Sequence, residues 1–385
     1  MVRSLLPLAV LLRVAASVVL AKGDVPPRPA ICFHQGKLYA GPYLRRIDRD
    51  TGAAQVLWDK GFITCMASDG RDLWLGTRLE TVVRLRFGED GSIAEEQEWS
   101  LLPILHRGVF PHRISWGEDY GVYDLRAFPD AAYAFTGCGY AELDRAGGDW
   151  QRRRAFAGPD REPIGLIGDA EHLAFLSLQR APVEHWYEAQ WVIQSVGTHR
   201  DLLTIPARAS LQGGTFYLED RATTKVAAVE YRRLCAILPG EDHAWLVPRR
   251  SSSRNGVALL RYEPDTRTAQ GFRLGYKHGT LCNACRHGDT IWLLAHGQRG
   301  GSLIRFDCNT HTSELFTYEG PVRLERLVAD DTHVFILGQL HGPEWWDTDT
   351  SRIARFEIAT REFTVLPTPP VDITVEHMWG PDITP

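Results

Sequence analysis

The chain has 385 residues, of which 44% are hydrophobic and 24% charged; its formal net charge is −5 and its pI about 6.3. This composition excludes a disordered or collagen-like chain, and the net negative charge lacks the excess of basic residues that is typical of nucleic-acid-binding proteins. Twelve Trp, 35 Gly and 22 Pro against three Met indicate many short elements joined by turns.

Residues 1–21 have the features of an export signal. Arg3 supplies a positive start, an apolar run follows, and Val19-Leu20-Ala21 offers a small-residue cleavage site, although Arg13 interrupts the run. An uncleaved N-terminal anchor is the alternative. We predict a signal peptide over 1–21, an extended Pro-rich linker over 22–30, and a secreted or periplasmic mature chain without a membrane span.

The rest of the chain repeats itself. The clearest copy runs from Ala67 to Thr77 through Asp69-Gly70-Arg71-Asp72-Leu73-Trp74, and a second apolar run follows over 82–87. Further copies begin near 241, 286 and 330, and weaker ones near 35, 130 and 169. Each copy reads as β-rich runs separated by hairpin turns. The repeated unit is therefore predicted to be a four-stranded antiparallel meander.

Such a unit cannot bury both of its faces alone, and stacking units in a ring solves this problem. We predict an all-β chain with a single β-propeller over 31–366, most simply with seven four-stranded blades and a C-terminal tail over 367–385. The blades are expected near 31–60, 61–102, 123–158, 163–205, 234–275, 280–319 and 323–366. Insertions are expected near 103–122 and 206–233. A pair of stacked sheets is the alternative, but it does not account for the recurring aromatic residue after the turn.

Two segments resemble known propeller repeats. Asp69-Gly70-Arg71-Asp72-Leu73-Trp74-Leu75-Gly76-Thr77 is similar to the repeat of two-component-regulator propellers. The segments 36–41 and 46–52 resemble quinoprotein-type repeats, which are related to WD-like propellers. The resemblance covers most of the mature chain and implies blade architecture, but it says almost nothing about activity.

The meander places the loops after its second and fourth strands on one face of the ring, and this face receives the long loops and both insertions. Binding sites usually lie on such loops. Candidate ligand-binding residues there are Glu344, Trp345, Trp346, Asp347, Asp349, His185, Trp186, Tyr187, Arg249, Arg254, His296, His112 and Arg113. Adjacent Trp residues beside acids suit stacking on a sugar ring, while the simpler interpretation places one Trp between blades and the acids in solvent. Asp347 and Asp349 also resemble the start of a calcium loop, but the glycine and the distal glutamate are missing.

The seven cysteines are too few for a disulfide scaffold, and their odd number leaves at least one thiol. Cys282 and Cys285 do not predict a zinc site, because residues three apart on a strand face opposite sides unless a bulge intervenes. Aligning the repeats makes Cys235 and Cys282 equivalent; we expect two buried thiols at these positions, with a disulfide between neighbouring blades as the alternative.

No Gly-x-Ser-x-Gly, His-Glu-x-x-His or P-loop sequence occurs. We therefore predict a monomeric binding protein without cofactor or metal, whose loop-rich face binds a protein or a carbohydrate. The alternative is a propeller enzyme, a lyase or hydrolase acting on a carbohydrate or lactone, which would assemble scattered His, Arg, Asp and Glu side chains around the channel. Nucleic acid is not an expected partner.

Overall fold

The computed structural model describes part of the chain. The described residues are 30–101, 103, 121–129, 131–136, 139–144, 148, 150–152, 161–166, 172–179, 186–195, 201–210, 215–218, 228–230, 234–239, 243–248, 257–263, 268–274, 280–296, 301–340 and 351–367. Strands but not side chains are described between residues 151 and 237. The predicted signal peptide, the linker up to residue 29 and the tail from residue 368 lie outside these residues.

The described strands form seven antiparallel sheets, each with its strands in chain order. The first three sheets comprise β1 (Ile31–His34), β2 (Lys37–Ala40), β3 (Leu44–Ile47) and β4 (Ala54–Trp58); β5 (Ile63–Ser68), β6 (Leu73–Thr77), β7 (Thr81–Phe87) and β8 (Ile93–Ser100); and β9 (Val122–Ala127), β10 (Ala131–Thr136), β11 (Gly139–Asp144) and β12 (Trp150–Arg152).

The fourth sheet comprises β13 (Arg161–Leu166), β14 (His172–Gln179), β15 (Trp186–Ser195), β16 (Asp201–Ser210), β17 (Thr215–Leu218) and β18 (Ala228–Glu230). The last three sheets comprise β19 (Leu234–Pro239), β20 (Ala244–Pro248), β21 (Val257–Glu263) and β22 (Thr268–Arg273); β23 (Thr280–His287), β24 (Thr290–His296), β25 (Gly301–Asp307) and β26 (Ser313–Tyr318); and β27 (Val322–Ala329), β28 (His333–Leu340), β29 (Ser351–Glu357) and β30 (Glu362–Val365).

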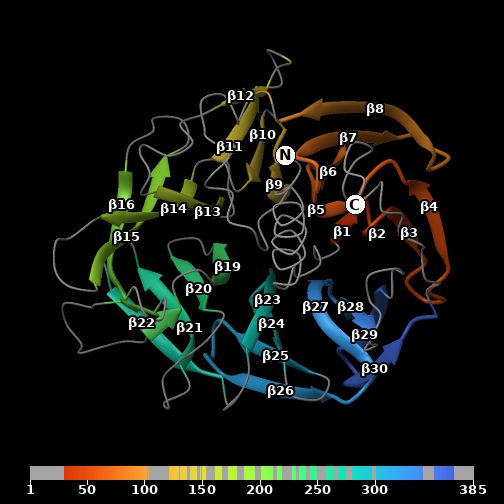
Figure 1. The fold of residues 1–385 in the computed structure, drawn as a ribbon. Helices are drawn as coiled ribbons and strands as arrows, with labels where there is room; N and C mark the ends of the chain where they lie inside the picture. Colours follow the sequence, from red (N-terminus) through yellow and green to blue (C-terminus); the bar gives the residue numbers. More distant parts are fainter. Residues whose placement is uncertain are drawn as a thin grey trace, which may run out of the picture.

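These sheets follow one another around a central axis (Figure 1). The first strand of each sheet lies innermost and the later strands lie toward the rim. β1 contacts β5 on one side and β27 on the other, so the first and last sheets are neighbours. This arrangement confirms the prediction of an all-β propeller and rules out the pair of stacked sheets. The number of blades in the complete ring stays a prediction.

The fourth sheet differs from the expected four-stranded unit. Part of the segment that we expected to be an insertion, 206–233, instead lengthens β16 and adds β17 and β18 as further strands. Thr215, Phe216 and Tyr217 are β-branched or aromatic residues, which favour a strand, and pairing with an existing edge satisfies backbone groups that a loop would leave to solvent.

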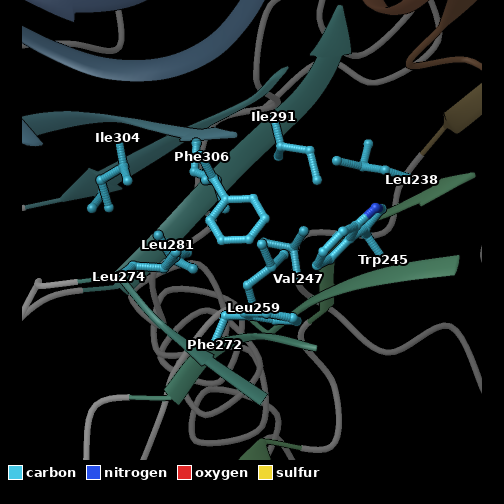
Figure 2. Packing of buried hydrophobic residues seen from close by; sticks show 12 residues of the cluster. Leu238, Trp245, Val247, Leu259, Phe272, Leu274, Leu281, Ile291, Ile304 and Phe306 are labelled. Atoms are coloured by element: carbon cyan, nitrogen blue, oxygen red, sulfur yellow. The ribbon is translucent and has the colours of Figure 1, made fainter. Parts of the chain in front are cut away.

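Neighbouring sheets pack through apolar clusters, and Figure 2 shows the cluster between β19–β22 and β23–β26. Trp245 in this cluster is fully buried, and its ring centroid lies 5.3 Å from that of Phe272 and 5.2 Å from that of Phe306. Burial of each such side chain stabilises the fold by about 1.5–3 kcal/mol. Trp292 and Trp74 occupy the corresponding places in their own sheets, which explains the recurring aromatic residue of the repeat.

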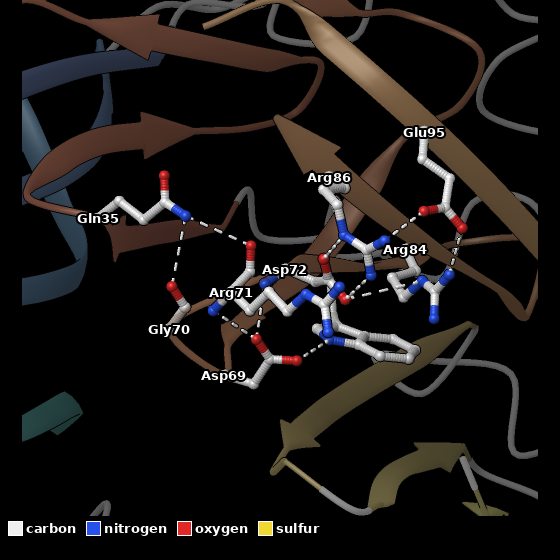
Figure 3. A network of polar contacts seen from close by, with 9 residues as sticks. Gln35, Asp69, Gly70, Arg71, Asp72, Arg84, Arg86 and Glu95 are labelled. Carbon is white, nitrogen blue, oxygen red and sulfur yellow. Dashed lines mark hydrogen bonds and ion pairs between the residues drawn. The ribbon is translucent and has the colours of Figure 1, made fainter. Parts of the chain in front are cut away.

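The acidic residues of the repeat form its turns (Figure 3). Asp69 accepts hydrogen bonds from the backbone N–H groups of Arg71 (2.8 Å) and Asp72 (2.6 Å), and from Trp74 Nε1 (3.0 Å). Gly70 has φ +87°, a conformation that glycine adopts without strain. Asp330 repeats this pattern with the N–H groups of Thr332 and His333, both at 2.8 Å. The most conspicuous sequence repeat therefore has a structural role.

Among the described strands, none is shared between the first and last sheets, and side chains connect the two. An apolar cluster that includes Leu38 and Phe335 lies between them. Arg49 pairs with Asp330 and lies over the rings of Phe33 and Phe335, at 5.5 and 5.4 Å from their centroids. The closing contact thus combines apolar burial with a cation–π and an ionic contact.

A β-bulge recurs near the start of the innermost strand. It falls at Thr64, Tyr123, Ile164, Cys235, Cys282 and Glu325, one in each sheet after the first. Thr64 Oγ1 lies within hydrogen-bond distance of Gly76 O (3.1 Å) and Val122 O. A bulge re-aims side chains locally. Here it directs the Thr64 hydroxyl toward the carbonyl of the next sheet.

Candidate functional site

Most of the loop residues that we selected from the sequence lie outside the described part of the chain. This applies to Glu344, Trp345, Trp346, Asp347, Asp349, His185, Arg249, Arg254, His112 and Arg113. Their role at the loop-rich face, and the gathering of long loops on that face, stay predictions.

Three further candidates lie in strands and not in the loops where we expected them. Trp186 and Tyr187 begin β15 and pair with Ser210 and Ala209 of β16. His296 is the last residue of β24 and pairs with Gly301. The hairpins are longer than predicted because β-rich runs extend the ladder until a turn residue ends it. The loop positions assigned to these three residues were therefore wrong.

Cys282 is buried between two neighbouring sheets. It is the free thiol that we expected and not the alternative disulfide with Cys235; its Sγ lies 3.5 Å from Leu294 O and 3.6 Å from Leu324 O. Thr64 contacts the two equivalent carbonyl oxygens around its own sheet, those of Gly76 and Val122. The equivalence of Cys235 and Cys282 is correct, and both are bulge positions. At Cys282 the residue serves as a weak hydrogen-bond donor.

The bulge also changes the geometry that we used for Cys282 and Cys285. Both side chains pack against the same apolar cluster between β23–β26 and β27–β30, and not on opposite sides of the strand. Burial raises the pKa of Cys285 to about 12, so its thiol stays protonated at neutral pH. Among the described residues, no group of three or more His, Cys, Asp and Glu side chains is arranged to hold a metal ion.

A cavity of about 490 Å³ lies between innermost strands of the ring. Its described lining comes from β1, β5, β9, β23 and β27, so five sheets contribute to it. This size is within the range of small-molecule sites. The cavity is the best-defined candidate site in the described part of the chain.

The cavity wall carries charged side chains at related positions. Asp124, Asn283 and Arg326 each follow the bulge of their own strand, so the strand registers place them at one level of the channel. Arg126 lies two residues beyond Asp124, and its Nε is 3.6 Å from Asp124 Oδ1. Asn283 Oδ1 accepts a hydrogen bond from Leu327 N at 3.0 Å. These groups can bind a polar ligand by charge and by hydrogen bonds.

Two thiols line the same cavity. Burial raises the pKa of Cys32 to about 12, against the opposing charge of Arg126. Burial also raises the pKa of Cys65; the charge of Asp124 adds to this increase, and Arg326 opposes it. Both thiols therefore stay protonated and are poor nucleophiles at neutral pH.

One histidine–serine pair lies at an end of the cavity. His34 Nδ1 is 2.7 Å from Ser68 Oγ, and Ser68 Oγ also accepts from Gly70 N at 3.1 Å. His287 occupies the equivalent strand position in its own sheet and lies 2.8 Å from Asp331 of the next sheet. Because the contact recurs between sheets, we interpret the His34–Ser68 pair as a structural link and not as a nucleophile with its base.

None of the channel residues was among the candidates selected from the sequence. Asp124, Arg126 and Arg326 lie within short β-rich runs and carry no motif. One signal was available, because aligning the repeats places Asp124, Asn283 and Arg326 at equivalent positions of the innermost strand. Polar residues at an inner-strand position that is otherwise Cys, Gly or Ala mark a channel lining.

No protein-family model and no curated protein sequence matches the chain. Solved structures with the same fold include puromycin hydrolase, with a TM-score of 0.52, 13% identity, and coverage of 93% of this chain but 56% of that protein. An oligogalacturonate lyase from Vibrio parahaemolyticus has a TM-score of 0.51, 9% identity, and coverage of 84% and 83% of the two chains. A chain of the mitotic checkpoint complex has a TM-score of 0.51, 10% identity, and coverage of 82% and 89%.

These similarities identify a β-propeller protein. At such low identity they establish the fold alone, and the structures that share it include enzymes as well as a component of a protein assembly. In the part of the chain that the structure describes, no helix is long and apolar enough to cross a membrane.

Proposed function

We propose that this chain is a binding propeller without catalytic activity, in which a small polar ligand enters the axial channel from the loop-rich face. The observation that supports the proposal is the cavity of about 490 Å³ on the ring axis, with Asp124, Arg126, Asn283 and Arg326 in its wall. Charged groups on an apolar, rigid scaffold are typical of a specific binding site. The loop-rich face, with Trp345 and Trp346, is then the entrance that contacts the remainder of the ligand or a protein partner.

The proposal is tested by asking whether the channel holds a ligand. Small molecules released by denaturing the purified protein are identified by mass spectrometry, and their rebinding is measured by calorimetry. Ala284 lines the cavity, so Ala284→Phe serves as a channel-filling variant, with circular dichroism to check its fold. We expect binding to the original protein and a loss of binding in the variant. Undiminished binding by a folded variant, or no enriched molecule and no binder in a library of polar metabolites, contradicts the proposal.

The enzymatic alternative remains a separate proposal. The lyase or hydrolase that we considered would convert a carbohydrate or a lactone, and oligogalacturonate lyase shows that the fold can carry a lyase in another protein. Turnover of a ligand identified in the first experiment would favour this alternative over binding alone. Export to a secreted or periplasmic location and a monomeric state also belong to the proposal; fractionation and sedimentation test them.

A further inference from the structure

We infer that the axial cavity recognises its ligand through a carboxylate group, held by the guanidinium of Arg326 with Arg126 as a second cation. This inference rests on the proposed binding function and specifies the chemical class of the ligand. It is carried by the hydrogen-bonding state of Arg326, by the charge of the cavity wall and by the size of the cavity.

Arg326 lies in the cavity wall with an unsatisfied donor. Its Nε is buried and has no hydrogen-bond partner, and within the described part of the chain its guanidinium forms neither a hydrogen bond nor an ion pair. A buried N–H group without an acceptor is unfavourable, and most such groups in folded proteins are paired. An acceptor brought by a ligand would satisfy it. The planar fork of arginine matches the two oxygens of a carboxylate.

Asp124, the acid in the described cavity wall, does not act as the acceptor for Arg326. Asp124 accepts a hydrogen bond from Leu125 N at 3.0 Å, and its Oδ1 lies 3.6 Å from Nε of Arg126 on the same strand. The described lining contains two arginines and one aspartate, so its formal charge is +1. A monoanionic ligand neutralises this charge, whereas a cation would meet a net repulsion.

The remaining wall defines the rest of the ligand. Asn283 uses Oδ1 for Leu327 N, so its amide N–H groups remain as donors toward the cavity, which Asn283 lines. Ser68 adds a hydroxyl to the wall. Apolar residues such as Leu125 and Val328 also line the cavity. The site therefore suits a small carboxylate with further oxygen atoms, and its volume of about 490 Å³ excludes a folded macromolecule.

Matched probes test this inference in the full chain. Glycolate and glycolamide, and glucuronate and glucuronamide, have similar shapes within each pair and differ in one charged carboxylate. Binding of each probe is measured by calorimetry and by the rise of the unfolding temperature with probe concentration. We expect the carboxylates to bind at least about tenfold more tightly than the amides, since bonds to charged groups exceed neutral ones. Their affinity should fall as salt is raised.

Two variants localise the effect. Arg326→Gln removes the charge and the fork and should weaken carboxylate binding by about tenfold or more, while leaving amide binding within about twofold. Arg323→Gln is the matched control, because Arg323 lies on the same strand, is 47% exposed and does not line the cavity. It should change neither affinity by more than about twofold.

The outcomes separate this inference from the proposed function. Equal binding of acids and amides, or full carboxylate binding by a folded Arg326→Gln protein, overturns the carboxylate inference and leaves a channel that binds neutral molecules. The inference is also overturned if none of the four probes binds while the metabolite library yields a neutral ligand that Ala284→Phe excludes. If no molecule binds in either experiment, the proposed function itself fails.

Discussion

The network around Asp72 allows a quantitative prediction about stability (Figure 3). Asp72 is 1% exposed and accepts hydrogen bonds from Arg86 Nε (2.9 Å) and Nη2 (3.2 Å), while Arg84 Nε lies at 3.8 Å. In Asp72→Asn the amide oxygen can keep one bond, but the amide nitrogen would face an arginine donor. Arg86 is 30% exposed and keeps Glu95, so water and Glu95 offset part of the loss. We expect Asp72→Asn to lower the free energy of unfolding by about 2–3 kcal/mol.

Glu95→Gln is the control, because it removes a carboxylate from the same two arginines. Glu95 is 44% exposed and lies 2.6 Å from both Arg84 and Arg86. Solvent screening should limit its cost to about 0–1 kcal/mol. Urea unfolding followed by tryptophan fluorescence and by circular dichroism measures both variants, and coincident transitions justify a two-state treatment. A loss below about 1 kcal/mol for Asp72→Asn, or equal losses for both variants, would refute the argument that burial sets the magnitude.

Three other predictions follow from the contacts between sheets. Cys282→Ser should keep the stability of the protein, because a hydroxyl can donate to the same carbonyls, whereas Cys282→Ala should cost about 1–2 kcal/mol in urea unfolding; equal stability of the two variants contradicts the donor role. Phe335→Ala should lower the free energy of unfolding by about 3–5 kcal/mol, because Phe335 is 1% exposed and packs where the ring closes; a loss below 1 kcal/mol in thermal unfolding contradicts this packing. Burial lowers the pKa of His34 below 6.5, so the unfolded chain binds its proton more readily and stability is lost as pH falls below about 6.5. His34→Gln should flatten this part of the stability profile between pH 5 and 7.5, and an unchanged slope would refute the assignment to His34.

The sequence by itself determined the repeating unit. Turn formation is local, so Asp69-Gly70 and the equivalent acid at Asp330 identify hairpins without knowledge of the rest of the chain. The aromatic residue after each turn marked the repeat in the sequence, and positions that recur with a repeat are expected to be buried in the same way each time. Trp74, Trp245 and Trp292 are all buried, each at the equivalent place in its sheet.

The tertiary structure decided which side chains meet. Asp124 and Arg326 are about two hundred residues apart in the chain and lie in the wall of one cavity because the ring brings their innermost strands together. The bulges at Thr64 and Cys282 reverse the strand alternation that sequence reasoning assumes, and no local pattern predicts a residue inserted into a ladder. Local propensity therefore determined the four-stranded unit. The set of side chains that line the channel depends on contacts between blades, which arise only when the ring is assembled.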